Sequence, residues 1–161
     1  MPAAKRTLET LGPYQGRDLL LQYSGGTAFF EDADVLSARR DPRQPERDLE
    51  LISGIDNLTQ ALANRLKTRR GELAALGHPD YGSRHHELIG EPNTDRTRNL
   101  IKLYILQALR DEPRVERVLA VKVSAEQQPP RSTVRVEMSL RVLGEASPLN
   151  LVLPFSLEIV P

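Results

Sequence analysis

Cysteine and tryptophan are absent from this 161-residue chain, and aromatic residues make up only 4% of it. Without cysteine, the chain forms neither a disulfide framework nor a thiolate metal site. The shortage of aromatic rings argues against a sugar-binding groove and against a platform for single-stranded nucleic acid, because both use aromatic faces for stacking.

An excess of charge of either sign is also missing, since Lys plus Arg and Asp plus Glu number 22 each. Zero net charge argues against bulk attraction to nucleic acid or to an anionic membrane, and it suits a component of an assembly. No apolar run reaches the roughly 18 residues of a membrane span, and residues 1–14 lack the apolar core of a secretory signal. We therefore expect a cytoplasmic protein that neither binds nucleic acid nor inserts into a membrane.

Residues 1–46 differ in character from the rest and are interpreted as an N-terminal extension and linker. Short strands are predicted at 19–23 and 28–30, with a turn at 24–26 between them. Residues 41–46 are polar and contain two prolines, which predicts a loop. Two roles stay open for this extension, namely packing on the core and docking on a partner.

The first predicted helix follows a short predicted strand at 49–52. Its apolar stripe recurs every three or four residues and comprises Ile55, Leu58, Leu62 and Leu66. Asp56 or Asn57 is expected to cap its start, and Gln60 has the spacing of a capping box. Gly71 is expected to end the helix after a basic last turn.

Two further helices are predicted before the chain changes period. Ser83 is expected to cap a short helix over 84–89. Thr94 and Asp95 then start the longest helix, which runs to about Arg110. Its centre is apolar on most sides, so we expect it to be buried against more than one neighbour.

The C-terminal third alternates apolar and polar residues at 119–123, 133–142 and 149–159, a strong strand pattern. Short connections favour an antiparallel meander, and Pro154 places the last strand at an edge or marks a bulge. The expected fold class is α+β, with two to three helices on one face of a small antiparallel C-terminal sheet. This domain is predicted to span 47–161, after the N-terminal extension.

The last strand is the first candidate for a binding site. An edge strand exposes unpaired backbone groups, so a partner is expected to add a strand there by β-augmentation. Ordinary sheet membership without a partner strand is the alternative. The residues assigned to partner binding on this strand are Leu151, Leu153, Phe155, Leu157 and Ile159.

Four short motifs occur in a fixed order between residues 47 and 123. They are Thr-Arg-Arg-Gly-Glu at 68–72, Pro-Asp-Tyr-Gly-Ser at 79–83, Glu-Pro at 91–92 and Glu-Pro-Arg-Val at 112–115. In this order and spacing the chain resembles the baseplate wedge family of contractile phage tails, also known as baseplate protein W or lysozyme-like baseplate protein. The same family serves type VI secretion and extracellular contractile injection systems.

The resemblance implies a structural, non-enzymatic baseplate subunit that binds the wedge complex and starts sheath polymerisation, without a cofactor. Its implied partners are other wedge subunits and sheath subunits, with tube or spike-hub proteins as further candidates. Sheath subunits of such machines exchange strands with their neighbours, which gives the predicted edge strand a role as a template.

The resemblance also makes Glu112, Pro113 and Arg114 the central motif. Pro113 stops a helix because it lacks a backbone N–H and clashes with the preceding turn. Arginine presents a planar fork that fits carboxylates and carbonyls. Two interpretations stay open: the motif binds a partner, or it locks a corner of its own chain.

A peptidoglycan hydrolase is the alternative function, and a generic adaptor domain is a further one. Glycoside hydrolysis requires two carboxylates beside a sugar cleft. The candidate carboxylates are Glu72, Asp80, Glu87, Glu91 and Glu112. The shortage of aromatic residues argues against the cleft.

Two other residue clusters are expected to carry no chemistry. His85 and His86, next to Glu87 and downstream of His78, are adjacent on a helix and should point apart, and the i, i+4 spacing of a zinc helix is missing. The basic residues at the end of the first helix are interpreted as a solvated face rather than a phosphate site: Arg65, Lys67, Arg69 and Arg70.

Overall fold

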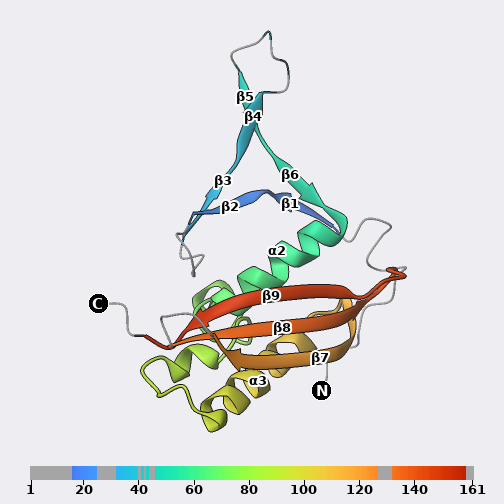
Figure 1. Cartoon of the computed structure of the whole chain (residues 1–161). Coiled ribbons are helices and arrows are strands. Elements are labelled where there is room, and N and C mark those ends of the chain that lie inside the picture. The colour runs from blue at the N-terminus through green and yellow to red at the C-terminus, as the bar shows by residue number, and fades with distance from the viewer. Residues whose placement is uncertain are drawn as a thin grey trace.

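The computed structural model describes residues 16–24, 32–39, 41, 43, 46–126 and 132–158. Two helices, α2 (Gly54–Lys67) and α3 (Asp95–Arg110), lie on one side of a three-stranded antiparallel sheet (Figure 1). The strands of this sheet, in spatial order, are β7 (Val115–Ala125), β8 (Thr133–Val142) and β9 (Leu149–Ser156). The α+β fold class and the meander predicted from the sequence are confirmed.

The central strand β8 forms the floor of the core. Its alternate residues are buried under the helices and include Val134, Val136, Met138, Leu140 and Val142. Helix α3 supplies Ile101, Ile105 and Leu109 to the same core, while α2 supplies Leu58 and Leu62. The remaining side chains of β8 are polar and lie on the opposite face, as the alternation predicts.

Helix α2 begins and ends differently from the prediction. The residue before it is Ser53, whose side chain makes no capping hydrogen bond, so neither Asp56 nor Asn57 caps the helix. Strand β6 (Leu51–Ser53) runs directly into the helix and thereby fixes its start. The helix ends at Lys67, because Thr68 turns to an extended conformation, and not at Gly71.

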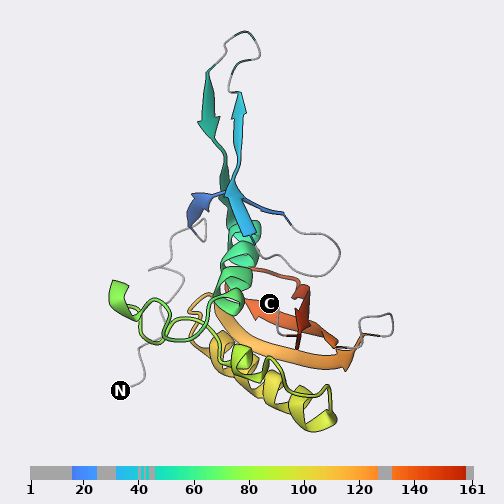
Figure 2. The same cartoon turned by 90° about the vertical axis from the view of Figure 1, so that its left-hand side faces the viewer.

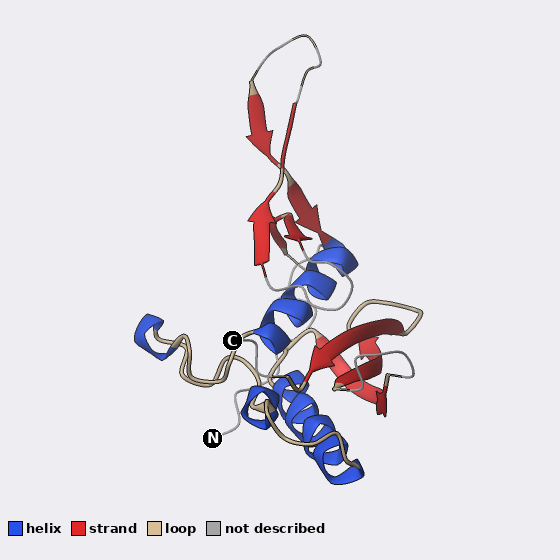
Figure 3. Cartoon of the chain, turned by 60° about the vertical axis from the view of Figure 1, so that its left-hand side comes forward, coloured by secondary structure: helices blue, strands red, loops and turns tan. Residues whose placement is uncertain are grey.

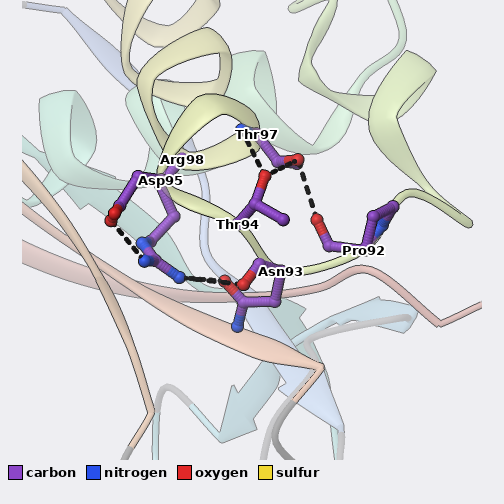
Figure 4. Close-up of polar contacts among 6 residues, drawn as sticks. All are labelled: Pro92, Asn93, Thr94, Asp95, Thr97 and Arg98. Carbon is purple, nitrogen blue, oxygen red and sulfur yellow. Dashed lines mark hydrogen bonds and ion pairs between the residues drawn. The ribbon is translucent and has the colours of Figure 1, made fainter.

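Helix α3 starts where the sequence predicts, at Thr94. The Thr94 hydroxyl oxygen accepts a hydrogen bond from the Thr97 N–H at 3.2 Å, and the Thr97 hydroxyl donates to the Pro92 carbonyl at 2.8 Å (Figure 4). Arg98 bridges Asn93 and Asp95 through its guanidinium, with N–O distances of 2.6 and 2.5 Å. These contacts satisfy orphan groups of the first turn and fix the helix entry.

A ribbon of short strands projects from the start of α2, away from the sheet (Figures 1 and 2). We refer to the described residues from 17 to 53 as the arm. Its strands are β1 (Arg17–Leu19), β2 (Leu21–Ser24), β3 (Asp32–Val35), β4 (Ser37–Arg39), β5 (Arg47–Leu49) and β6. The strands pair as β1–β6, β2–β3 and β4–β5, all antiparallel.

Three backbone segments meet in the arm at a closed ring of hydrogen bonds. The Leu20 N–H donates to Glu50, the Leu36 N–H to Leu20, and the Glu50 N–H to Leu36, at 2.8–3.0 Å. Each segment therefore changes its partner at this junction, which splits the strands predicted at 19–23 and 49–52 into two pieces each. The strand predicted at 28–30 lies outside the described residues, and the loop predicted at 41–46 connects β4 to β5.

The arm is fixed to α2 by the side chain of Gln60. This amide donates to the Leu19 carbonyl at 2.8 Å and accepts from the Leu21 N–H at 2.9 Å. Gln60 thus fills the place of a strand neighbour between β1 and β2, instead of completing a capping box. Strand β1 lies before the predicted boundary at residue 46 and β6 lies after it, and the two pair in one two-stranded sheet. The division at that residue stays a prediction.

The segment after α2 returns to the helix end through a short parallel bridge between Arg69 and Ser83. The intervening loop, with the 3₁₀ turn η1 (Ala74–Leu76), protrudes from the body of the molecule (Figure 3). Gly82 has φ +101°, and a Cβ there would lie 2.6 Å from the Thr68 carbonyl oxygen, so the bridge requires glycine. The 3₁₀ turn η2 (His85–Leu88) follows, preceded by Arg84, and Ser83 does not cap it.

Candidate functional site

The corner between α3 and β7 holds a buried carboxylate between two arginines. Glu112 is 4% exposed and accepts from Arg114 Nε at 2.7 Å and from Arg114 Nη2 at 3.3 Å. Arg65 of α2 approaches the same carboxylate at 3.5 Å. The guanidinium of Arg65 also lies over the ring of Tyr81, 4.5 Å from its centroid. Residues from α2, the 77–83 loop and the α3–β7 corner therefore meet at one point.

The two arginines set the ionisation of this carboxylate. Burial alone would raise the pKa of Glu112, but the hydrogen bonds and charge of Arg114, with the charge of Arg65, outweigh it and lower the pKa below its usual value. The pKa of Tyr81 is raised, mainly by burial. Glu112 is thus an anion that holds the corner together.

The prediction that the basic C-terminal end of α2 is a solvated face is wrong for Arg65. Its side chain is only 12% exposed, and its Nε has no hydrogen-bond partner within the described residues. Arg65 follows Leu62 by three residues and Leu58 by seven, so it lies on the buried stripe of α2. This spacing could have indicated from the sequence that Arg65 is buried. Arg69 and Arg70 lie on the surface as expected, and Arg70 pairs with Asp80 at 2.7 Å.

The two adjacent histidines also differ from the prediction. Their ring centroids lie 4.3 Å apart instead of diverging, because both rings turn to pack edge-on against Phe155 of β9. His85 is bound to the Ser83 hydroxyl at 2.7 Å, and His86 to the Leu66 carbonyl at 2.9 Å. Burial lowers the pKa of His85 to about 3, so its ring is neutral. No cluster of three potential metal ligands occurs in the part of the chain that the structure describes.

The carboxylates considered for hydrolysis are mostly engaged elsewhere. Glu72 accepts from the backbone N–H of Arg69 at 3.0 Å, Asp80 pairs with Arg70, and Glu87 pairs with Arg84 at 2.9 Å. Glu112 forms the corner described above, and Glu91 is exposed. A general acid in a glycosidase needs a raised pKa, whereas those of Glu87 and Glu112 are lowered.

Strand β9 lies at the edge of the sheet and pairs with β8 through eight residues, from Leu149 to Ser156. Leu157 N–H donates to the Ser132 carbonyl, so odd-numbered residues of β9 direct their backbone groups toward β8. Even-numbered residues direct theirs outward, and among the described residues none finds a backbone partner there. Pro154 lies at an even position, and its missing N–H falls on this open edge.

The helix-facing side of β9 is covered less completely than that of β8. Leu151, Leu153 and Phe155 are half-buried, whereas their neighbours on β8 are fully buried. Of the other residues assigned to partner binding, Leu157 lies in the core and Ile159 lies outside the described residues. Asn150 and Val152 were not among the residues assigned to partner binding, although their backbone N–H groups line the open edge. The position of Pro154, whose missing N–H has to face outward, could have indicated them.

A pocket of about 310 Å³ opens between β9 and α2. Its walls include Leu153 and Phe155 of β9, Ala63, Leu66 and Lys67 of α2, and His86 and Ile89 after the 77–83 loop. The lining is mainly apolar, and burial lowers the pKa of Lys67 to about 8.

Residues 36–141, more than half of the chain, match the family described as contractile injection system sheath initiators. The chain belongs to this family. The resemblance to baseplate proteins of contractile machines is thereby confirmed, and the sheath initiator has a structural role in a contractile injection system that involves other baseplate or sheath components.

Among the solved structures that resemble this chain is one that is similar in both sequence and fold. It is a Geobacter sulfurreducens protein named as a "putative tail lysozyme", 26% identical, with a TM-score of 0.55. The likeness covers 63% of this chain and 89% of the other. None of the curated proteins compared with the chain matches it. Neither described helix of the sheath initiator has the length and apolar character needed to cross a bilayer.

Proposed function

We propose that this sheath initiator is a baseplate subunit that templates the first ring of sheath by strand addition to β9. The observation that carries the proposal is that β9 combines an open backbone edge with a half-covered apolar face. An extended segment from a sheath subunit would pair with the open edge through main-chain hydrogen bonds and would cover the apolar face with its own apolar side chains. The protein acts in the baseplate after assembly in the cytoplasm.

The register restricts where the sheath strand forms its bonds. Before Pro154, the outward N–H donors are those of Asn150 and Val152, while Pro154 offers only a carbonyl acceptor. Strand addition therefore depends on the N-terminal half of β9. Val152 is 48% exposed, so its side chain contributes little to the fold.

Val152→Pro tests this directly, because it removes one outward donor and leaves the bonds to β8 in place. We expect baseplates that contain this variant to assemble but to carry no sheath in electron micrographs. Val152→Ala keeps the donor and is expected to initiate sheath normally. The melting temperature of each purified variant is the control for folding. Normal sheath on Val152→Pro baseplates would refute the template role.

The second part of the proposal is that the corner formed by Glu112, Pro113 and Arg114 holds the sheath initiator in the wedge. Arg114 keeps 15% of its side chain exposed, and Arg65 and Arg114 together outnumber the single carboxylate of Glu112. The exposed part of the Arg114 fork, at the rigid end of α3, fits a carboxylate or a carbonyl of another wedge subunit.

Arg114→Ala is expected to keep a cooperative melt but to be missing from purified baseplates. Arg117→Ala is the matched control, because Arg117 is an exposed arginine on β7, three residues after Arg114. This variant should be incorporated normally. A variant of Arg114 that no longer melts cooperatively would show that the arginine serves only the fold.

A peptidoglycan hydrolase is the second candidate, favoured by the name of the Geobacter sulfurreducens relative. Against it, three of the five candidate carboxylates, those of Asp80, Glu87 and Glu112, are held in ion pairs, and the pKa of the most buried one, Glu112, is lowered. We propose a non-enzymatic protein. Clearing of a peptidoglycan suspension by the purified chain, lost in Glu112→Gln, would overturn this.

A further inference from the structure

The pocket between α2 and β9 lies where a strand added to β9 would direct half of its side chains. Neighbouring residues on paired strands point to the same face of a sheet. Leu153 and Phe155 point toward the helices and form one wall of the pocket. A side chain opposite them on an added strand would therefore enter the space in front of Ala63 and Leu66.

The lining selects the chemistry of the side chain that enters. Aliphatic and aromatic groups dominate the walls, and the ring of Phe155 is held at 79° to that of His85, with 4.4 Å between centroids. His85 is itself buried and bound to Ser83, so this wall is fixed and uncharged. Lys67 and Glu158, of opposite charge, also line the pocket, so the preference that its lining sets is for an apolar side chain and not for a charge of either sign.

The size of the pocket points to a side chain of a protein partner. A volume of about 310 Å³ is at the lower end of the range for ligand pockets, about 300–1,000 Å³. Leu153 to Ser156 of β9 line the pocket, and the next residue toward the start of this strand, Val152, offers its N–H to an extended backbone. A small molecule in the pocket would use only its apolar walls, whereas a strand would use both the walls and the backbone donor.

We propose that this pocket receives a large aliphatic or aromatic side chain from the sheath strand that pairs with β9, and so sets the register of that strand. This inference rests on the proposed function. Backbone pairing alone leaves register weakly specified, because a strand can slip by two residues and keep the same face. One anchored side chain removes this freedom, which a template for a symmetric ring requires.

Ala63→Phe tests the pocket by filling it from the α2 side while leaving every backbone group of β9 unchanged. Ala61→Phe is the matched control, since Ala61 is half-buried on the same helix but does not line the pocket. Binding of purified sheath subunit to the full-length variants is measured by calorimetry, and sheath on assembled baseplates is counted by electron microscopy. We expect Ala63→Phe to weaken binding at least tenfold and Ala61→Phe to change it less than twofold.

The outcomes separate the pocket from the template role. If Val152→Pro abolishes sheath initiation while Ala63→Phe binds sheath subunit normally, the template role stands and the pocket proposal is overturned. If both variants initiate sheath normally, both proposals fail. Should Ala63→Phe lose its cooperative melt, Ala63→Met decides, because it fills less of the pocket; unchanged binding in that variant overturns the proposal.

Discussion

Replacing Glu112 by glutamine tests whether the buried ion cluster stabilises the corner. The carboxylate accepts two side-chain bonds and one backbone bond from Arg114, and it faces Arg65 at 3.5 Å. Breaking a buried pair by removing one partner costs about 3–5 kcal/mol, since the other charges stay buried. Glutamine keeps the shape and one acceptor oxygen, so we expect a loss near the lower limit, about 3 kcal/mol.

Urea unfolding at pH 7, followed by circular dichroism, measures this loss. With an m-value of about 2 kcal/mol per molar, the midpoint should fall by about 1.5 M. Glu87→Gln is the matched control, because Glu87 forms an ion pair with Arg84 of similar geometry at the exposed surface. Its unfolding midpoint should stay close to that of the wild type.

The pH dependence provides a second test of the same cause. The pKa of Glu112 is lowered in the folded protein, so its contribution to stability is present above the unfolded value of about 4.5 and is lost as pH falls through the folded pKa. The difference between wild type and Glu112→Gln should therefore shrink in acid. Equal midpoint shifts in Glu112→Gln and Glu87→Gln, or a difference that persists unchanged in acid, would refute the reasoning.

Two further variants probe the loop and the arm. Gly82→Ala should lower the free energy of unfolding by about 3 kcal/mol or more, because its Cβ would lie 2.6 Å from the Thr68 carbonyl oxygen. Gly71→Ala, with φ +86° and an ordinary contact of 4.0 Å to the Pro79 carbonyl oxygen, should cost about 1 kcal/mol in the same urea titration. Gln60→Ala should speed hydrogen exchange of the Leu21 amide about tenfold without moving the amides of β8; equal protection in variant and wild type would show that the arm does not depend on this side chain.

The C-terminal sheet and the longest helix were predictable because their patterns are long and local. The strand at 133–142 has the predicted bounds, and α3 starts after Thr94, whose hydroxyl caps it as expected. Because the side chains alternate over ten residues, only one orientation of the strand directs all of its apolar side chains to the buried face of the sheet. Pro154 predicted that the last strand lies at an edge, because a strand inside a sheet requires backbone N–H donors on both sides and proline has none.

Strands at 19–23 and 49–52 were predicted, but their division and pairing in the arm were not, since each strand has only three or four residues and changes partner at Leu20, Leu36 or Glu50. Such pairings are decided by contacts distant in sequence. The role of Gln60 shows the same limit. Its spacing from Asn57 fits a capping box, yet its amide binds the backbone of a segment about forty residues away.

The candidate corner was half predictable. Glu112 and Arg114 are two residues apart around a proline that stops the helix, so their proximity follows from the local sequence. The participation of Arg65 follows only if its place on the buried stripe of α2 outweighs the tendency of basic residues to gather at helix ends. The pocket was not predictable, because its walls come from five separate elements: α2, η2, α3, β8 and β9.

Helix α2 links the features on which the proposed function depends. Within its 14 residues, Gln60 fixes the arm, Arg65 reaches the buried carboxylate of the corner, and Ala63 and Leu66 form a wall of the pocket. A template has to hold the first sheath strand at a defined position relative to the baseplate, which requires supports that are rigid with respect to one another. A single helix in contact with all three features provides this rigidity. Strand addition at β9 is then positioned by the same element that contacts the corner proposed to bind the wedge.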